Sequence, residues 1–251
     1  MKKSFVIGAS GLIGGELLSV LKLNSENAIG TYTNNFEKGL IKFDMNNLNF
    51  GALGEVREGD IFYILSAYSN PSWIAANKEE AKKLNFKQTI DLINFLIEKR
   101  VKIIFMSSVE IFDGKKGNYS EDDDPNPLNY YGELKLAIEH YLEKNYENYT
   151  IARTGWNVGF NHKSRCVIQL TYETLMKKNA RMASDNYFSL SHTRDTANGL
   201  YNSSKQENLP KIHIASEKII NRYEMAESIK SKSINGNQMS FEKCLFSEII
   251  Y

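Results

Sequence analysis

Short apolar runs alternate along the chain with longer stretches in which apolar residues recur at helical spacing. The runs at residues 4–8, 60–65 and 101–106 are nearly continuous in aliphatic and aromatic residues. That pattern is typical of strands in a parallel sheet that is covered on both faces. Residues 11–23 and 78–98 repeat apolar positions every three or four residues and are expected to be helices. Strands that alternate with helices indicate a doubly wound α/β fold.

The alternation continues toward the C-terminus and becomes less regular after residue 155. Further strands are expected at residues 28–33, 40–43, 149–153 and 211–214, and further helices at residues 129–144, 167–178, 193–203 and 222–231. Residues 114–128 contain an acidic run and two prolines and are expected to be a loop. The predicted architecture is a Rossmann-type doubly wound parallel sheet with a small C-terminal lobe.

Composition and charge exclude several classes of protein. The chain has 251 residues, of which 42% are apolar and 24% are charged, so it is neither collagen-like nor wholly disordered. Its net charge of +1 gives no surplus that would favour nucleic acid or an anionic membrane surface as a partner. The glycines that interrupt the first apolar run argue against a signal peptide, and Cys166 and Cys244 lack metal-ligand spacing. We therefore expect a cytoplasmic protein with one large domain or one domain and a small appendage.

Gly8, Gly11 and Gly14 stand three residues apart between the first predicted strand and the first predicted helix. Glycine permits a positive φ and a close approach of the backbone to a ligand. The free N–H groups and the positive dipole at the start of a helix suit a pyrophosphate. This context predicts an NAD(P)-binding domain over residues 1–155, with residues 156–251 forming mostly a substrate-binding lobe whose segments return in part to the sheet. A tight turn without a ligand is the alternative.

Tyr131 and Lys135 lie one helical turn apart in the predicted helix 129–144 and therefore share a face. An ammonium beside a phenol is expected to lower the phenol pKa, so that Tyr131 can exchange a proton near neutral pH. Ser108 follows the predicted strand 101–106, at the sheet edge where open α/β folds bind ligands. The tyrosine–lysine spacing alone is common in helices. The position of Ser108 strengthens the interpretation that Tyr131 and Lys135 are catalytic. Tyr130 is out of phase and is expected to pack.

The glycine spacing, Ser108, the pair Ile111-Phe112, Tyr131 and Lys135 together resemble the extended short-chain dehydrogenase/reductase family. Within that family, residues 5–159 resemble sugar-nucleotide reductases of the dTDP-4-dehydrorhamnose reductase group. The resemblance implies that Ser108, Tyr131 and Lys135 are catalytic, that Asp44 contacts the adenine amine and that Asn85 supports the active-site backbone. It implies a cofactor site formed by Gly8, Ser10, Gly11, Leu12, Ile13, Gly14, Thr33, Asn34, Asp44, Met45, Ser66, Ala67, Tyr68, Asn85, Tyr131 and Lys135.

The residues after the second predicted strand bear on the choice between NADP and NAD. A protein that prefers NAD usually has an acid there that binds the ribose 2′-hydroxyl. This chain has Thr33, Asn34 and Asn35, with Lys38 nearby. Neutral donors and a lysine tolerate the 2′-phosphate of NADP better than a carboxylate would, and this favours NADP. An arginine that would bind the 2′-phosphate is missing, so NAD remains open as the cofactor.

The same resemblance places the substrate against Ser108, Val109, Glu110, Arg153, Trp156 and His192. The related 4,6-dehydratases carry an acidic pair after the equivalent strand, and here Val109 replaces the first acid. A dehydratase is therefore not expected, and Glu110 is either a surface acid or a sugar contact. Trp156 is either a core residue or a stacking residue.

Several other polar residues are expected to be structural or solvated. His140, His162 and His213 lack the spacing of a metal site, so no metal is expected. Asp195 is expected to cap the predicted helix 193–203. The acidic run 121–124 is expected to be a solvated loop.

The sequence therefore leads us to expect an NAD(P)H-dependent reductase of a nucleotide-linked 4-keto-6-deoxysugar, with a role in polysaccharide biosynthesis. Its partner is the nucleotide-sugar, and a homodimer is common in related folds. Two alternatives remain open: an NAD-dependent nucleotide-sugar epimerase, and a catalytically silent NAD(P)-binding regulatory subunit.

Overall fold

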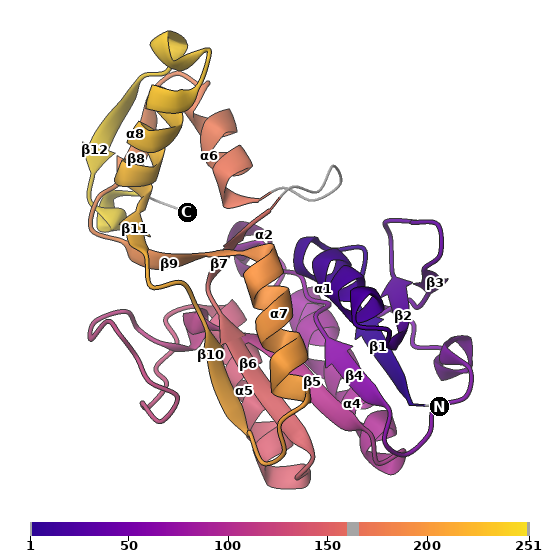
Figure 1. Cartoon of the computed structure of the whole chain (residues 1–251). Coiled ribbons are helices and arrows are strands. Elements are labelled where there is room, and N and C mark those ends of the chain that lie inside the picture. Colours follow the sequence, from indigo (N-terminus) through magenta and orange to yellow (C-terminus); the bar gives the residue numbers. More distant parts are fainter. Residues whose placement is uncertain (1, 160–165, 250–251) are drawn as a thin grey trace.

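A parallel sheet forms the centre of the protein in the computed structural model, which describes residues 2–159 and 166–249. Its strands are β1 (Lys3–Ile7), β2 (Asn27–Tyr32), β3 (Ile41–Lys42), β4 (Ile61–Ile64), β5 (Lys102–Ser108), β6 (Tyr149–Thr154) and β10 (Lys211–Ile214). The seven strands lie in the order β10-β6-β5-β4-β1-β2-β3, and every pairing is parallel (Figure 1). The predicted doubly wound fold is confirmed.

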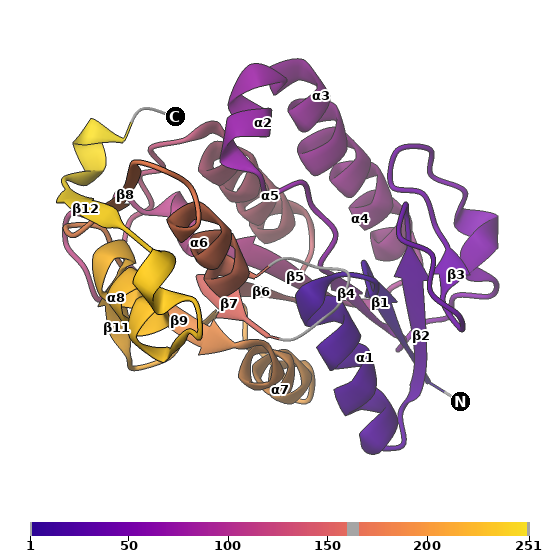
Figure 2. The same ribbon diagram turned by 90° about the horizontal axis from the view of Figure 1, so that it is seen from above.

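Helices cover both faces of this sheet. Figure 2 shows α1 (Leu12–Leu23) and α7 (Thr193–Ser204) on one face, and α4 (Gln88–Glu98) and α5 (Tyr130–Asn145) on the other. Successive side chains of a strand point to opposite faces, so Phe5 packs toward α4 and α5, whereas Val6 packs toward α1 and α7. Burial on both faces explains why the strands are nearly continuous in apolar residues.

The predicted helix 78–98 is interrupted in the structure. It consists of α3 (Lys78–Lys82), a π-helical turn η2 (Lys83–Lys87) and α4, and it is preceded by an additional short helix, α2 (Pro71–Ala76). Asn70 caps α2 by accepting a hydrogen bond from the Trp73 backbone N–H, with Pro71 at the first helical position. The π-helical turn contains Asn85, one of the residues expected to support the site backbone.

The C-terminal part forms a small lobe and also returns to the large sheet. The lobe contains β7 (Trp156–Val158), β8 (Ala180–Ala183), β9 (Tyr187–His192), β11 (Ile219–Asn221), β12 (Phe241–Cys244), α6 (Val167–Leu175) and α8 (Arg222–Lys232). Its strands pair as β11-β9-β7 and β12-β8. The short 3-10 turns of the chain are η1 (Phe50–Leu53), η3 (Val109–Ile111), η4 (Gly236–Gln238) and η5 (Phe246–Glu248). Helix α7 packs against α1 on one face of the large sheet, and strand β10 pairs with β6 at its edge (Figure 1).

No helix in the described part of the chain combines the length and the apolar character needed to cross a bilayer. Both cysteines are free thiols, Cys244 buried and Cys166 half-buried.

Candidate functional site

A cavity of about 250 Å³ opens at the carboxyl edge of the large sheet, between the ends of β1 and β4. Strand order reverses there, because β2 lies on one side of β1 and β4 on the other, and such a switch point is where open α/β sheets bind ligands. The cavity is lined by Gly8, Ser10, Gly11, Thr33, Asn34, Asn35, Met45, Asn46, Leu65, Ser66, Ala67, Tyr68, Leu84 and Asn85. Most of the residues predicted to bind the cofactor are therefore brought together. Leu65, Leu84 and Asn46 line the cavity as well and were not predicted.

The glycine loop has the backbone geometry that an anion site needs. Gly8 has a φ of +93°, and a Cβ there would lie 3.0 Å from the Ser66 backbone nitrogen. A Cβ at Gly14 would lie 2.2 Å from the carbonyl oxygen of Gly8. The start of α1 has no side-chain cap at Gly11 and no acidic residue in its first turn. Its backbone N–H groups and helix dipole therefore fit a pyrophosphate.

The loops after β2 and β3 form the far wall of the cavity. The Thr33 hydroxyl donates to the Phe43 carbonyl oxygen at 3.1 Å and accepts from the Met45 N–H at 3.4 Å, so it ties the two loops together. Asp44 accepts from the backbone N–H and the side-chain amide of Asn46, both at 2.9 Å. Asn34 and Asn35 line the cavity with neutral amides.

Asn85 holds the loop after β4 in place. Its side-chain oxygen accepts from the Tyr68 N–H at 2.8 Å, and its amide donates to the Tyr68 carbonyl oxygen at 2.7 Å. Asn85 is buried, and the Tyr68 ring stacks on Trp73 with centroids 4.9 Å apart. The resemblance implied that this asparagine supports the site backbone, and these two hydrogen bonds are such a support.

Of the three residues predicted to be catalytic, Ser108 ends β5, and Tyr131 and Lys135 lie in the first two turns of α5, which packs against β5 and η3. The Lys135 ammonium donates to the Met106 carbonyl oxygen at 2.8 Å and lies 5.7 Å from the centre of the Tyr131 ring. Ser108 is the last residue of β5, and its hydroxyl accepts from the Glu110 N–H at 3.1 Å. The Tyr131 ring packs in an apolar cluster that includes Trp73, which links it to the Tyr68 wall of the cavity.

The start of α5 is seated directly on the turn that follows Ser108. Asn129 caps the helix by accepting from the Gly132 N–H at 2.9 Å, and its amide donates to the Glu110 carboxylate at 2.6 Å. A Cβ at Gly132 would lie 2.1 Å from the Glu110 carbonyl oxygen, so only glycine allows this approach. This contact sets the position of Tyr131 relative to Ser108. The Glu110 carboxylate is thus bound by the Asn129 side chain of the same protein.

Burial dominates the acid–base behaviour of the site. It raises the pKa of Tyr131 well above its ordinary value, and the negative charge of Glu110 adds to the effect. The expected net lowering of the Tyr131 pKa is therefore not found, because burial is the largest effect on the phenol and raises its pKa. Burial lowers the pKa of Lys135 from 10.5 to about 8, against the opposing charge of Glu139.

Arg153 does not lie on the cavity, which corrects its assignment as a substrate contact. Its side chain is 2% exposed, and its guanidinium forms an ion pair with Glu139 at 2.7 Å. It also donates to the Glu121 carbonyl oxygen at 3.1 Å. The Glu121 carboxylate accepts from the His213 N–H at 2.7 Å, so the acidic run is not simply a solvated loop as expected.

The other predicted substrate residues lie in the C-terminal lobe or next to it. Trp156 is 38% exposed on β7, with Arg222 over its ring at 5.6 Å. Val109 lies next to Gly155, where an added Cβ would be 3.5 Å from the valine. His192, not Asp195, is the N-cap of α7, because its Nδ1 accepts from the Arg194 N–H at 3.1 Å. Asp195 is instead in the first turn of α7. His162 lies outside the described residues.

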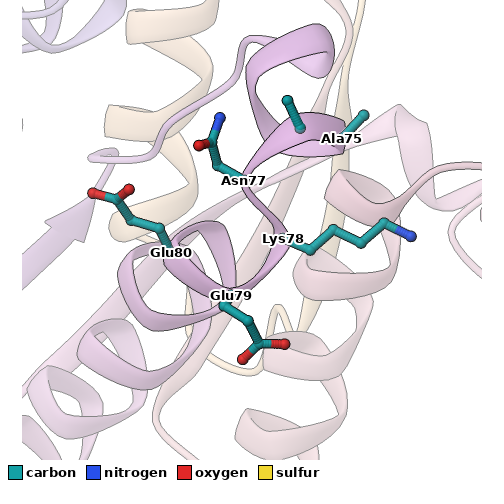
Figure 3. Close-up of a pocket in the computed structure, with 6 residues that line it drawn as sticks. Ala75, Asn77, Lys78, Glu79 and Glu80 are labelled. Carbon is teal, nitrogen blue, oxygen red and sulfur yellow. The ribbon is translucent and has the colours of Figure 1, made fainter.

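A second, more open hollow of about 480 Å³ lies between α2 and α3. Figure 3 shows that Lys78, Glu79 and Glu80 on its rim point in different directions and do not converge on a common point. It contains none of the predicted site residues. The smaller cavity, where the glycine loop and the amides of Asn34, Asn35 and Asn85 come together, is therefore the candidate site.

Comparison with known proteins gives low identity over parts of the chain. Methionine adenosyltransferase 2 subunit beta of Xenopus tropicalis is 28% identical over 156 residues, which are 61% of this chain and 46% of that protein. The probable low-salt glycan biosynthesis reductase Agl14 of Haloferax volcanii is 28% identical over 142 residues, 55% of this chain and 47% of that protein. The chain thus spans about half the length of the curated relatives that it matches.

The solved structures extend the likeness to the whole fold. A hypothetical dTDP-4-dehydrorhamnose reductase from Sulfolobus tokodaii superimposes with a TM-score of 0.77 at 26% identity, over 96% of this chain and 85% of that one. A dTDP-4-dehydrorhamnose reductase of Bacillus anthracis in complex with NADP gives a TM-score of 0.80 at 20% identity, over 99% and 86% of the two chains. The family model described as the RmlD substrate binding domain matches residues 2–240, so this chain belongs to that NAD(P)-binding family.

Proposed function

We propose that the protein is an NAD(P)H-dependent reductase of a nucleotide-linked 4-keto-6-deoxysugar. The observation that carries this proposal is the packing of α5, which contains Tyr131 and Lys135, against the end of β5 at Ser108, on the same carboxyl edge of the sheet as the cavity. The similarity to a reductase of glycan biosynthesis and to dTDP-4-dehydrorhamnose reductases supports the substrate class.

The cofactor would lie across the carboxyl edge of the sheet. The uncapped start of α1 suits its pyrophosphate, and the loop of Ser66, Ala67 and Tyr68 would face its ribose. Thr33, Asn34 and Asn35 carry no negative charge, which supports a preference for NADP over NAD. When bound, the reduced cofactor supplies the hydride that adds to the ketone carbon.

The protein supplies the proton and holds the developing negative charge. Because burial and Glu110 raise the pKa of Tyr131, its phenol is protonated at neutral pH and can donate the proton to the ketone oxygen. Ser108 donates a hydrogen bond to the same oxygen. Lys135, with a pKa of about 8, is mostly charged at neutral pH and stabilises the phenolate left behind.

The test is to measure the turnover of a panel of nucleotide-linked 4-keto-6-deoxysugars with NADPH or NADH. The loss of absorbance of the reduced nicotinamide gives the rate. Tyr131→Phe is expected to reduce the rate by about 10²–10⁴-fold because the proton donor is lost, with cofactor affinity nearly unchanged. Tyr130→Phe, one residue away and packed beneath the Lys78 ammonium, is the matched control and should retain activity. Equal rates for wild type and Tyr131→Phe on every turned-over substrate would contradict the proposal.

A regulatory subunit is the second candidate, favoured by the similarity to a protein named as the beta subunit of methionine adenosyltransferase 2. It predicts that the protein binds NAD(P) but that wild type and Tyr131→Phe are equally inert across the whole panel. An epimerase, in contrast, would be purified with its nicotinamide tightly bound and would turn over without added cofactor.

A further inference from the structure

A buried ion pair lies directly behind the predicted catalytic residues. The Arg153 guanidinium on β6 donates from Nε to both Glu139 oxygens at 3.2 Å, and from Nη2 to Oε2 at 2.7 Å. The two side chains are 2% and 1% exposed. This two-pronged geometry is the strong form of an arginine–carboxylate pair.

The pair reaches the strand that carries Ser108. The Ser107 hydroxyl donates to Glu139 Oε1, and Ser107 lies opposite Arg153 in the register of β5 and β6. Ser108 follows Ser107 directly, so the same carboxylate that binds Arg153 also anchors the end of β5.

The pair also reaches Lys135 along α5. Glu139 is one turn further along the helix than Lys135, and positions i and i+4 share a face. The Lys135 ammonium lies over the Phe105 ring at 4.7 Å and is buried, and burial disfavours its charge. The negative charge of Glu139 raises the pKa of Lys135 and so opposes the effect of burial.

Other charged groups lie near this helix. Glu110 on η3 acts on Tyr131, and Lys78 on α3 lies over the Tyr130 ring at 5.6 Å. On the far side of Arg153, His213 on β10 lies 3.3 Å from its Nη1. Glu139, in contrast, lies one turn from Lys135 and raises the pKa of its ammonium.

Stability alone does not account for a pair of this kind. Replacing a buried ion pair by apolar side chains of similar size is often neutral or stabilising. Arg153 and Glu139 thus need a role beyond holding the fold, and their contacts with Ser107 and their distance of one turn from Lys135 supply one.

We propose that Glu139 is a positioning residue for Lys135: paired with Arg153, it fixes the end of β5 and supplies the negative charge that keeps the buried ammonium protonated at neutral pH. The significance of this role for turnover rests on the proposed reductase function. The charge on Lys135 itself can be measured without turnover.

The experiment compares wild type, Glu139→Gln and the double variant Glu139→Gln/Arg153→Met. The single variant leaves the Arg153 guanidinium without its counter-charge and is expected to lower the melting temperature. The double variant removes both charges and is expected to recover most of that loss. Glu143→Gln is the matched control, because Glu143 lies one turn further along α5, is partly exposed and pairs with Lys211 at 2.6 Å.

The readout is NMR of isotope-labelled lysine side chains, titrated from about pH 6 to about pH 10, with the Lys135 signal assigned by its loss in Lys135→Met. Wild type and Glu143→Gln are expected to titrate at about pH 8. In Glu139→Gln the lysine is expected to titrate about one unit lower or more, since a nearby opposite charge contributes shifts of that size. The double variant is expected to shift less, because the like charge of Arg153 is removed as well. Affinity for NADPH should fall over the same pH range.

Two outcomes would overturn the inference: a folded Glu139→Gln variant in which Lys135 titrates as in wild type, or a wild-type Lys135 that is already neutral at pH 7. Failure of the proposed function is a separate result, in which no form of the protein binds NADPH or NADH while the lysine titrations still follow the expected order.

Discussion

At Lys135 the chain buries a charged group where an apolar one would be more stable. The side chain is 3% exposed, and its pKa falls from 10.5 to about 8 because burial disfavours the ammonium. The folded state therefore binds its proton less tightly than the unfolded state does. Such a cost is typical of a site selected for chemistry and not for stability.

Lys135→Met is expected to stabilise the protein at pH 7 by about 3–4 kcal/mol, since the pKa falls from 10.5 to about 8 and a difference of one pKa unit corresponds to about 1.4 kcal/mol. Between pH 8 and 10.5 the unfolded state binds more protons than the folded state, so wild-type stability rises with pH. The advantage of the variant should shrink over that range. Urea unfolding at several pH values measures it, and a variant that is no more stable than wild type at pH 7 would contradict the pKa shift.

On the scale of elements, the unit β1–turn–α1 depends on the absence of a side chain at Gly14. The helix approaches the strand so closely that a Cβ at Gly14 would lie 2.2 Å from the Gly8 carbonyl oxygen and 2.9 Å from the Ala9 Cα. Both neighbours are backbone atoms and cannot rotate away.

Gly14→Ala is therefore expected to push α1 away from β1. This over-packing is expected to lower the free energy of unfolding by about 1–3 kcal/mol. We also expect it to abolish detectable NADPH binding. Ser19→Ala is the control, because it introduces an alanine into the same helix at an exposed position. Fluorescence titration with NADPH reports binding, and thermal unfolding reports stability. Unchanged affinity in Gly14→Ala would show that the loop does not hold the pyrophosphate.

The π-helical turn η2 is the second element on which the site depends. A π-helical turn changes the phase of the helix, and here it contains Asn85, whose two hydrogen bonds hold Tyr68 on the cavity wall.

Asn85→Ala leaves the N–H and carbonyl of Tyr68 without these partners. We expect a loss of about 1–3 kcal/mol in the free energy of unfolding and an NADPH affinity at least about tenfold weaker. Asn94→Ala, on the exposed side of α4 where Asn94 accepts from Tyr141, should change neither by a comparable amount. If the two variants behave alike, the support of Tyr68 is not important for binding.

On the scale of the whole molecule, the C-terminal part is needed to complete the core of the N-terminal part. Helix α7 packs Ala197 and Leu200 against the same apolar cluster as Leu17 and Leu21 of α1. The Tyr63 hydroxyl of β4 donates to Ser204 of α7 at 2.8 Å. One face of the Rossmann sheet is thus covered in part by a helix that lies, in the chain, between two segments of the small lobe.

Leu200→Ala is consequently expected to destabilise the whole protein by about 2–4 kcal/mol, as truncation of a fully buried leucine does, in a single transition seen equally by probes of both parts. Asn198→Ala, exposed on the same helix, should change stability by less than about 0.5 kcal/mol. Separate transitions for the sheet and the lobe would contradict this coupling.

The elements that could be predicted from the sequence are those with strong periodicity. The large-sheet strands and helices α1, α5 and α7 fall within a few residues of the predicted ranges, because burial on one or both faces leaves a regular apolar pattern. Strands β7, β8, β9, β11 and β12 were missed, since three to six residues of mixed polarity carry no such signal. The short helix α2 was also missed, although Asn70 followed by Pro71 is a recognisable start.

The sequence by itself determined the alternating strands and helices of the large sheet and the position of the glycine loop, because each depends on local spacing. Only the tertiary structure decided that Arg153 is buried against Glu139, that His192 and not Asp195 caps α7, and that Glu121 binds the backbone of β10. The physical reason is that a polar side chain far from its partner in sequence has no local pattern that reveals the partner. Burial and the charges that surround each group, which also reversed the expected pKa shift of Tyr131, are set by segments brought together only by folding.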